Sequence, residues 1–340
     1  MKTRDEILLD SEATAVKFPD FITIWPYISQ KYMTNNKTCA YHYTDISGFM
    51  GILSDRCFWA SNIHFQNDNA EYKDGLSACL SLIDELSATP NNSLEKEYLS
   101  NLGQSLKDEY ALAIAGQISS KDIFTISFCN NGDLLSQWRG YGGVAGISIG
   151  IDEATLLEKT RFKEATLYEK EKLPYPKHER VAELSKVIYD DSVKRNIIQD
   201  IIAVGSKHIS FRQNAHDQYP CIYLEQAVSG VSSYLYRLFP LLKDNGFSEE
   251  QELRYVEQLT KNSNTHVDFR ERNGILLPYV KFKWLDVNCQ PLERLPIVDI
   301  IVGPTTQQML LIDSVKYFLK NSGFDYLVDK VRASLIPYRG

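Results

Sequence analysis

Tyr41-His42-Tyr43-Thr44-Asp45, followed by Ile46-Ser47-Gly48-Phe49-Met50-Gly51-Ile52-Leu53, is the stretch that decides the fold. Its first residues are aromatic or β-branched, as in a short strand. The last two residues before the apolar run are suitable helix N-caps. Cys57-Phe58-Trp59-Ala60-Ser61 then predicts a second strand. We therefore expect strand, helix, strand, with His42 at a sheet rim, where ligands commonly bind.

The composition is that of a globular protein. The chain has 340 residues, of which 44% are hydrophobic and 24% charged, enough for one large domain or two modest ones. A net charge of −7 argues against general nucleic-acid affinity. No apolar run approaches the roughly 20 residues of a bilayer span, and the charged N-terminus lacks the apolar core of a signal peptide. We therefore expect a cytoplasmic protein with no membrane partner.

The cysteines and histidines do not have the spacing of metal ligands. Six cysteines are scattered through the chain without a C-x-x-C pair, which disfavours a zinc site or a disulfide scaffold. The chain also lacks a P-loop, an H-E-x-x-H motif and a G-x-G-x-x-G motif. We therefore expect no metal.

Strands flank helical blocks along the rest of the chain. Helical periodicity covers 70–118 (broken at 90–92), 181–204, 221–242 and 305–320. Strand-like patterns cover 124–128, 144–151, 165–168, 252–257, 275–282, 297–302 and 328–336. Such an order indicates an α+β fold. We expect 1–38 to form an N-terminal helical extension and 39–340 a single domain with a helical insertion at about 170–245.

Two groups of residues could accompany His42 in a site. Trp138 and Tyr141 are three apart and share one face of a helical turn, with Arg139 between them and glycines nearby. They could plug the core or stack on a flat ring, and Arg139 could pair with a phosphate or a carboxylate. Glu250 and Glu252 alternate into a strand and so point to the same side of its end. His42 itself could be a ligand-binding residue or a histidine bonded to backbone.

Short motifs recur in a fixed order over about residues 39–340. They are Tyr41–Leu53, Trp138–Tyr141, the Glu-x-Glu-x-Arg run Glu250–Arg254, Pro278-Tyr279, Ile300–Pro304 and Ser334–Arg339. This order resembles a bacterial and phage-associated family of unknown function. The opening stretch also resembles the first strand and helix of the ADP-ribosyltransferase superfamily over residues 41–61. That second resemblance implies an ADP-ribosyltransferase-like split mixed β-sheet core with flanking helices.

The superfamily resemblance also implies roles for particular residues. His42 would orient the ribose of NAD, with Tyr43 and Thr44 completing the first motif. Tyr141 or Trp138 would stack on nicotinamide. The charge of Arg139 would suit the pyrophosphate, on physical grounds rather than from the resemblance. Glu252 or Glu250 would hold the ribose 2′-hydroxyl. The chain departs from the pattern where Tyr43 replaces the glycine of many relatives, and where the block 162–245 separates the aromatic motif from the acidic one.

The implied chemistry is coherent, because cleavage of the ribose–nicotinamide bond develops oxocarbenium character that a carboxylate stabilises. The hypothesis is an NAD-dependent ADP-ribosyltransferase or NAD glycohydrolase, acting as a toxin or antiphage-defence effector. The acceptor is open between protein, DNA, RNA and water, and the oligomeric state is open too. A second reading is a non-catalytic nucleotide- or protein-binding module of a defence or regulatory system. A third is a metal-dependent nuclease using Asp68, Glu71, Glu250 and Glu252.

Overall fold

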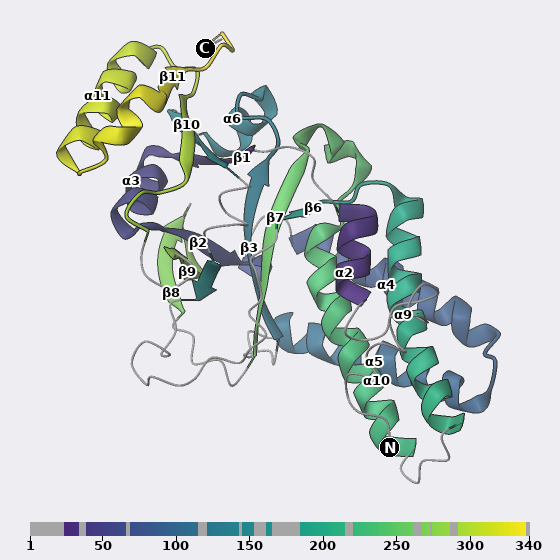
Figure 1. The fold of residues 1–340 in the computed structure, drawn as a ribbon. Helices are drawn as coiled ribbons and strands as arrows, with labels where there is room; N and C mark the ends of the chain where they lie inside the picture. The colour runs from purple at the N-terminus through teal and green to yellow at the C-terminus, as the bar shows by residue number, and fades with distance from the viewer. Residues whose placement is uncertain are drawn as a thin grey trace, which may run out of the picture.

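The protein has a mixed α+β fold with a mostly antiparallel open sheet and helices against its faces (Figure 1). The computed structural model describes residues 24–33, 39–65, 69–114, 121–142, 145–152, 161–164, 184–214, 220–260, 267–272, 274–285 and 292–337. The α+β expectation is confirmed at this level. Within the described residues, no helix combines the length and the apolarity that crossing a membrane requires.

The opening stretch forms the strand, helix and second strand that the sequence predicts. These are β1 (Cys39–Asp45), α3 (Ile46–Asp55) and β2 (Cys57–Asn62). Asp45 caps α3, because its Oδ1 accepts from the Gly48 N–H at 2.7 Å. Arg56 ends the helix in the left-handed region with φ 50°. Local signals therefore determine this unit.

The sheet is split beside the middle of β3 (Lys121–Cys129). One edge of β3 pairs along its whole length with β7 (Glu252–Thr260). On its other edge, β1 pairs only through Tyr41 and Cys129, and β2 pairs only at Phe124 and Thr125. The two strands diverge between these points. We call this gap between β1 and β2, beside Ser127, the split.

The remaining strands extend the sheet on both sides of the split. Beside β1 lie β4 (Gly146–Asp152), β10 (Ile297–Val302) and β11 (Val331–Ala333). Beside β2 lie β9 (Ile275–Leu285), β8 (Asp268–Arg272) and β5 (Arg161–Glu164). The two-residue β6 (Ser185–Lys186) pairs with β7. Only β10 and β11 pair in parallel within the described strands.

Two hydrophobic cores lie on the two faces of the central strands. The helical core contains α2 (Ile24–Ile28), α4 (Asn69–Ala88), α5 (Ser93–Ile114), α9 (Asp191–Asn214) and α10 (Pro220–Leu238). The opposite core contains α3 and α11 (Gln308–Asn321) with apolar side chains of the sheet. Figure 1 shows the helical block beside β7 and α11 at the far side of the sheet. The N-terminal residues Ile24 and Ile28 thus pack with the same helices as the predicted insertion.

Some predicted elements differ from the observed ones. Residues 184–190, expected in a helix, hold β6 and an extended segment, and α9 begins only at Asp191. The expected strand 328–336 begins instead in a 3-10 helix, Asp325–Lys330, which is followed by the three-residue β11. The sequence pattern does not predict β8. The expected strand 165–168 lies outside the described residues. The segment 133–143, whose sequence fits either a turn or a helix, contains the helix α6 (Leu135–Tyr141).

Candidate functional site

His42 occupies the split. Its Nδ1 lies 2.9 Å from the main-chain oxygen of Ser127, at the point where β1 leaves β3. The imidazole packs against Phe58 and Phe128, with ring centroids 5.3 and 5.6 Å away. A carbonyl oxygen can only accept, so Nδ1 carries the proton and Nε2 presents a lone pair. The His42 side chain therefore bonds the Ser127 carbonyl in place of a strand partner, and its Nε2 remains a hydrogen-bond acceptor.

The histidine is neutral at physiological pH. Burial, with a smaller contribution from the positive charges of Arg270 and Arg272, outweighs the opposing bond to Ser127 and lowers the pKa of His42 to about 4. A neutral imidazole with a protonated Nδ1 can accept a hydrogen bond from a hydroxyl group through Nε2. His42 can thus orient a sugar hydroxyl.

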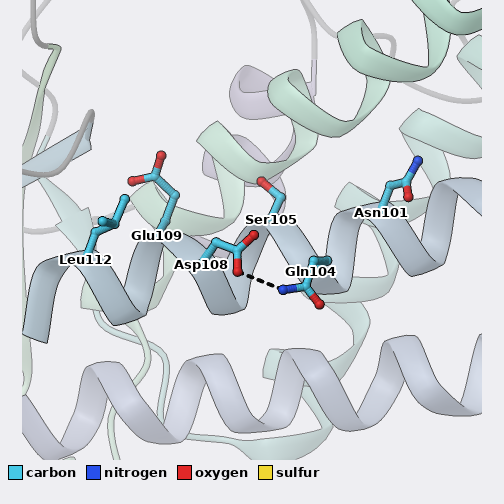
Figure 2. Close-up of a pocket in the computed structure, with 6 residues that line it drawn as sticks. All are labelled: Asn101, Gln104, Ser105, Asp108, Glu109 and Leu112. Atoms are coloured by element: carbon cyan, nitrogen blue, oxygen red, sulfur yellow. Dashed lines mark hydrogen bonds between the residues drawn. The ribbon is translucent and has the colours of Figure 1, made fainter.

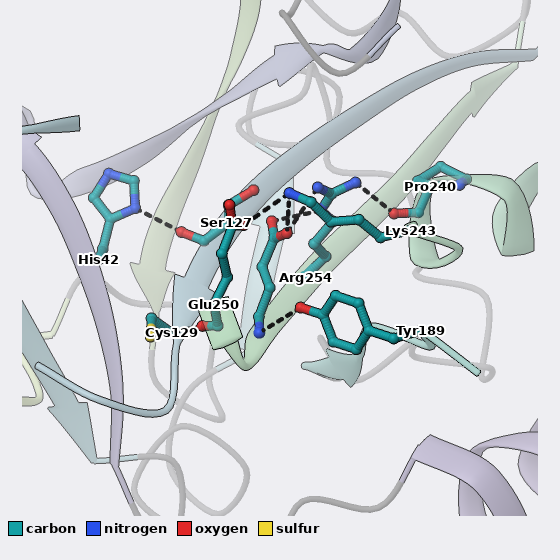
Figure 3. Close-up of polar contacts among 9 residues, drawn as sticks. His42, Ser127, Cys129, Tyr189, Pro240, Lys243, Glu250 and Arg254 are labelled. Atoms are coloured by element: carbon teal, nitrogen blue, oxygen red, sulfur yellow. Dashed lines mark hydrogen bonds and ion pairs between the residues drawn. The ribbon is translucent and has the colours of Figure 1, made fainter. Parts of the chain in front are cut away.

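The two glutamates of the Glu-x-Glu-x-Arg motif join a buried ion cluster. Glu252 begins β7, and Arg254 grips its carboxylate with Nε at 2.6 Å and Nη2 at 2.8 Å. Lys243 Nζ lies 3.2 Å from Glu252 and 2.8 Å from Glu250. Figure 3 shows Lys243, Glu250 and Arg254 converging beside the segment that carries Pro240. The cluster contains two positive and two negative charges.

Burial differs between the two carboxylates. The side chain of Glu252 is 4% exposed, and that of Glu250 is 16% exposed. Burial alone would raise the pKa of Glu252, but the charges of Arg254 and Lys243 outweigh it and lower the pKa. Glu250 does not lie on the strand as predicted. It ends a 3-10 helix (Asn245–Glu250), and Gln251 at φ 46° turns the chain into β7.

Ser127 lies between His42 and the ion cluster. Its carbonyl accepts from His42, and its hydroxyl donates to Glu252. Successive side chains of a strand point to opposite faces, so Phe128, which contacts His42, and Ser127 project on opposite sides of β3. Figure 3 shows His42 and the ions on the two sides of Ser127. The structure therefore joins these predicted residues through β3 rather than through one shared surface.

The predicted aromatic residues separate into a packed and a more open group. Trp138 is only 4% exposed, meets Tyr43 edge to face at 4.7 Å, and donates from Nε1 to Asp133 at 2.8 Å. Its ring is enclosed by protein, so Trp138 is a packed core residue. Tyr141 is half-buried and packs against the same cluster, whereas Arg139 is exposed.

Three of the ordered motifs meet at Trp138. A Cβ on Gly303 would lie 2.8 Å from Trp138 Cε3, which explains the glycine after β10. Asp133 accepts from the Ser334 hydroxyl at 2.5 Å and from the Leu335 N–H at 2.7 Å. The Trp-x-x-Tyr, Gly-Pro and C-terminal motifs thus form one structural junction.

Thr44 is half-buried on β1 opposite Ile147. Asp68 lies outside the described residues, and so does the side chain of Glu71. No group of three or more potential His, Cys, Asp or Glu metal ligands occurs in the described part of the chain.

Sequence reasoning missed Arg270, which lies on β8 beside the split. Its Nη2 donates to Ser61 at 2.8 Å, and its guanidinium lies 5.2 Å from the Trp59 ring and 5.5 Å from the Tyr279 ring. The signal was present in Asp268-Phe269-Arg270-Glu271-Arg272, where two arginines alternate on one face of a strand. Without β8 among the predicted strands, that alternation had no interpretation.

A surface hollow lies elsewhere on the molecule. A cavity of about 360 Å³ lies along α5. Figure 2 shows the residues that line it: Asn101, Gln104, Ser105, Asp108, Glu109 and Leu112. The Gln104 amide donates to Asp108 at 2.7 Å within it. None of the residues predicted for the site lines this cavity.

Comparison with known proteins matches part of the chain to a family. The model of a family described as a protein of unknown function (DUF2971) matches residues 137–255. This span is about a third of the chain and runs from α6 into β7, so it includes the Trp-x-x-Tyr block and the Glu-x-Glu-x-Arg motif. It supports the resemblance to a family of unknown function over these residues. No curated protein and no solved structure matches the chain.

Proposed function

We propose that this chain is an NAD-dependent ADP-ribosyltransferase or NAD glycohydrolase that binds its nucleotide beside the split. The observation that carries the proposal is the neutral His42 held in the gap between diverging strands, with Nε2 as an acceptor. A ribose hydroxyl suits that acceptor. A reaction that consumes NAD or modifies a macromolecule also suits a toxin or an antiphage-defence effector.

The geometry favours Glu250 over Glu252 as the carboxylate of the reaction. Stabilising an oxocarbenium requires negative charge that is not already neutralised. Glu252 is gripped by Arg254 on both oxygens and is also paired with Lys243. Glu250 has Lys243 as its ionic contact and a larger exposed fraction. Glu250 lies at the end of β3, where its main-chain oxygen accepts from Cys129. Its side chain would therefore need to swing from Lys243 around this end of β3 to reach a nucleotide beside His42, while Glu252 holds Arg254 and Lys243 in place.

The test is incubation with NAD labelled in the adenosine moiety, with lysate protein, RNA or DNA as acceptor. We expect the wild type to release nicotinamide and, if it is a transferase, to label an acceptor. Glu250→Gln should lower nicotinamide release by about 100-fold or more. Glu249→Gln is the matched control, because Glu249 is an exposed neighbour. Thermal unfolding of each variant separates lost chemistry from lost folding.

The outcomes bear on different parts of the proposal. A wild-type protein that releases no nicotinamide and labels no acceptor would refute the enzymatic proposal. Full activity in Glu250→Gln would refute the role of Glu250 alone. If Glu252→Gln loses activity only to the extent that its melting temperature falls, the role of Glu252 is structural.

A second candidate is a non-catalytic nucleotide-binding module. The observation that favours it is that Lys243 pairs with both glutamates in this conformation, leaving neither carboxylate without a cation. Calorimetric titration with NAD discriminates the two. Binding without nicotinamide release, and with the same affinity in Glu250→Gln, would support the module.

A further inference from the structure

Arg270 is a cation beside the split for which the described residues supply no ionic partner. It is half-buried, and its guanidinium lies against the rings of Trp59 and Tyr279. Its Nη2 donates to the neutral hydroxyl of Ser61. Its buried Nε has no hydrogen-bond partner within the described part of the chain.

A buried guanidinium Nε–H without an acceptor is unusual, because polar groups removed from water are normally hydrogen-bonded. The Nε–H without an acceptor indicates that an anionic partner binds here, one that the described protein residues do not supply. The aromatic contacts hold the guanidinium in place, so its remaining donors are oriented in advance. An anion bound there would gain charge-assisted hydrogen bonds without first ordering a side chain.

A second cation and the histidine lie close to this guanidinium. Arg272 is two residues further along β8, so its side chain leaves the same face of the strand. Both arginines act electrostatically on His42 and on Asp45. Asp45 is already committed to capping α3 through Gly48 and Ser47. Asp268 leaves the same face of β8, but Lys281 lies 3.9 Å from its carboxylate. Among the described carboxylates, Asp45 is therefore the one whose charge acts on Arg270.

We propose that Arg270, assisted by Arg272, binds a phosphate group of the ligand beside the split. The planar fork of an arginine fits the oxygens of a phosphate, and His42 Nε2 would accept from a sugar hydroxyl of the same molecule. The inference rests on the proposed function for the identity of the nucleotide. It assigns the pyrophosphate to Arg270 and Arg272 rather than to Arg139, the arginine that the sequence analysis considers for this role.

The test measures binding of three probes by calorimetry at constant ionic strength: ADP-ribose, inorganic pyrophosphate, and adenosine as the probe without phosphate. We expect ADP-ribose to bind the wild type and Arg270→Gln to weaken that binding at least 10-fold. Arg272→Gln should weaken it less, because Arg272 is exposed. Arg294→Gln is the matched control, an exposed arginine that lies over the Tyr326 ring, and it should bind as wild type does.

Arg270→Lys keeps the positive charge and controls for a loss of folding in Arg270→Gln. Lysine lacks the planar, two-pronged guanidinium, so we expect an intermediate loss of ADP-ribose affinity. Binding of pyrophosphate alone with the same loss in Arg270→Gln would assign the site to free phosphates. Equal ADP-ribose affinity in wild type and Arg270→Gln, or no binding of either phosphate probe to the wild type, would overturn the inference.

The inference and the proposed function can fail separately. A chain that binds ADP-ribose through Arg270 but releases no nicotinamide from NAD would keep the phosphate site and refute the enzyme. A chain that cleaves NAD with an unchanged KM in Arg270→Gln would keep the enzyme and refute the phosphate site.

Discussion

At the scale of single residues, the main polar feature is a pair of cations buried with two carboxylates. Lys243 and Arg254 are 3% and 1% exposed. Arg254 also donates from Nη1 to the Pro240 carbonyl at 2.7 Å, which ties β7 to the chain before Lys243. A buried ion pair adds little stability over a well-packed apolar pair, but removing one partner leaves an uncompensated charge. Its main consequence here is to fix how residues 240–254 are arranged.

The first prediction concerns that pair. Arg254→Met should lower the free energy of unfolding by about 3–5 kcal/mol, because Glu252 would lose both of its shortest hydrogen bonds. The double variant Arg254→Met/Glu252→Met should recover much of this loss, since it removes both members of the pair. Urea denaturation of the two variants and the wild type measures the difference. A double variant less stable than Arg254→Met would contradict this account.

The second prediction is a pH dependence of stability. The folded pKa of His42 is about 4, below its ordinary 6.5, so the unfolded chain binds the extra proton between these values. Stability from His42 is therefore complete above pH 6.5 and is lost as pH falls from 6.5 to 4. The pKa of Glu252 is also lowered, from 4.5, so its contribution is lost only below about pH 4.5. Acid thus weakens the fold in two successive windows.

His42→Gln should reduce the loss of unfolding free energy between pH 6.5 and pH 4 by up to about 3 kcal/mol. Some slope should persist, because burial also lowers the pKa of His64. The measurement is urea denaturation at half-unit pH steps for wild type and His42→Gln. Identical slopes in the two proteins would show that His42 titrates alike in the folded and unfolded chains.

The sequence predicted individual site residues only in part. Glu250 and Glu252 were expected together, and they share Lys243. The lysine itself was not predicted, because a turn of the chain brings it back to β7 and no local pattern records that. Arg270 is missed because its strand is not predicted, and because its contacts with Ser61 and Trp59 cross more than two hundred positions of sequence.

At the scale of elements, prediction succeeded where the signal was local. The unit β1–α3–β2 has its cap at Asp45, its apolar run and its second strand within about two dozen residues. β8 gave no such signal, because Asp268–Arg272 has charged residues at four of five positions. Residues 328–330 were expected to be extended, and they instead end a 3-10 helix that follows α11. The apolar side chains Leu327 and Val328 join the opposite core from this helical backbone.

The third prediction concerns the contact between α3 and β2. A Cβ on Gly51 would lie 2.1 Å from Trp59 Cη2, so Gly51→Ala must displace the indole or the helix. Trp59 is held by Asp55 and lies over Arg270, which limits its movement. We expect a loss of about 1–3 kcal/mol of stability. The loss should be accompanied by weaker ADP-ribose binding if Arg270 takes the phosphate.

Gly140→Ala is the matched control, because Gly140 is exposed in α6 and a Cβ at this position would meet no described atom within 4 Å. Alanine favours a helix over glycine by roughly 0.5–1 kcal/mol, so this variant should be neutral or slightly more stable. Thermal denaturation of both variants checks the pair. A Gly51→Ala protein as stable as wild type would show that Trp59 adjusts freely.

At the scale of the whole molecule, β3 and β7 join the two cores. Ile123 and Val256 face the helical core, whereas Phe124 and Leu253 face the opposite one. Neighbouring residues of one strand belong to different cores. Unfolding of β3 or β7 would therefore remove packing partners from both cores at once. A single domain from residue 39 onward stays a prediction, and this sharing of strands is a physical argument for it.

The last prediction follows from the shared strands. Leu235→Ala, at a fully buried position of α10, should cost about 2–5 kcal/mol. Trp25 lies in the helical core against Tyr234 and Arg237 of α10, so both proteins are compared in a Trp25→Phe background. Leu235→Ala should then lower the urea midpoint equally by circular dichroism, which reports mainly on the helical block, and by the fluorescence to which Trp59 and Trp138 on the sheet side contribute. Coincident transitions indicate one cooperative unit. If the helical signal were lost first while fluorescence kept its wild-type midpoint, the helical block would be an independent folding unit attached to the sheet, and the sharing of β3 and β7 would not couple the two cores.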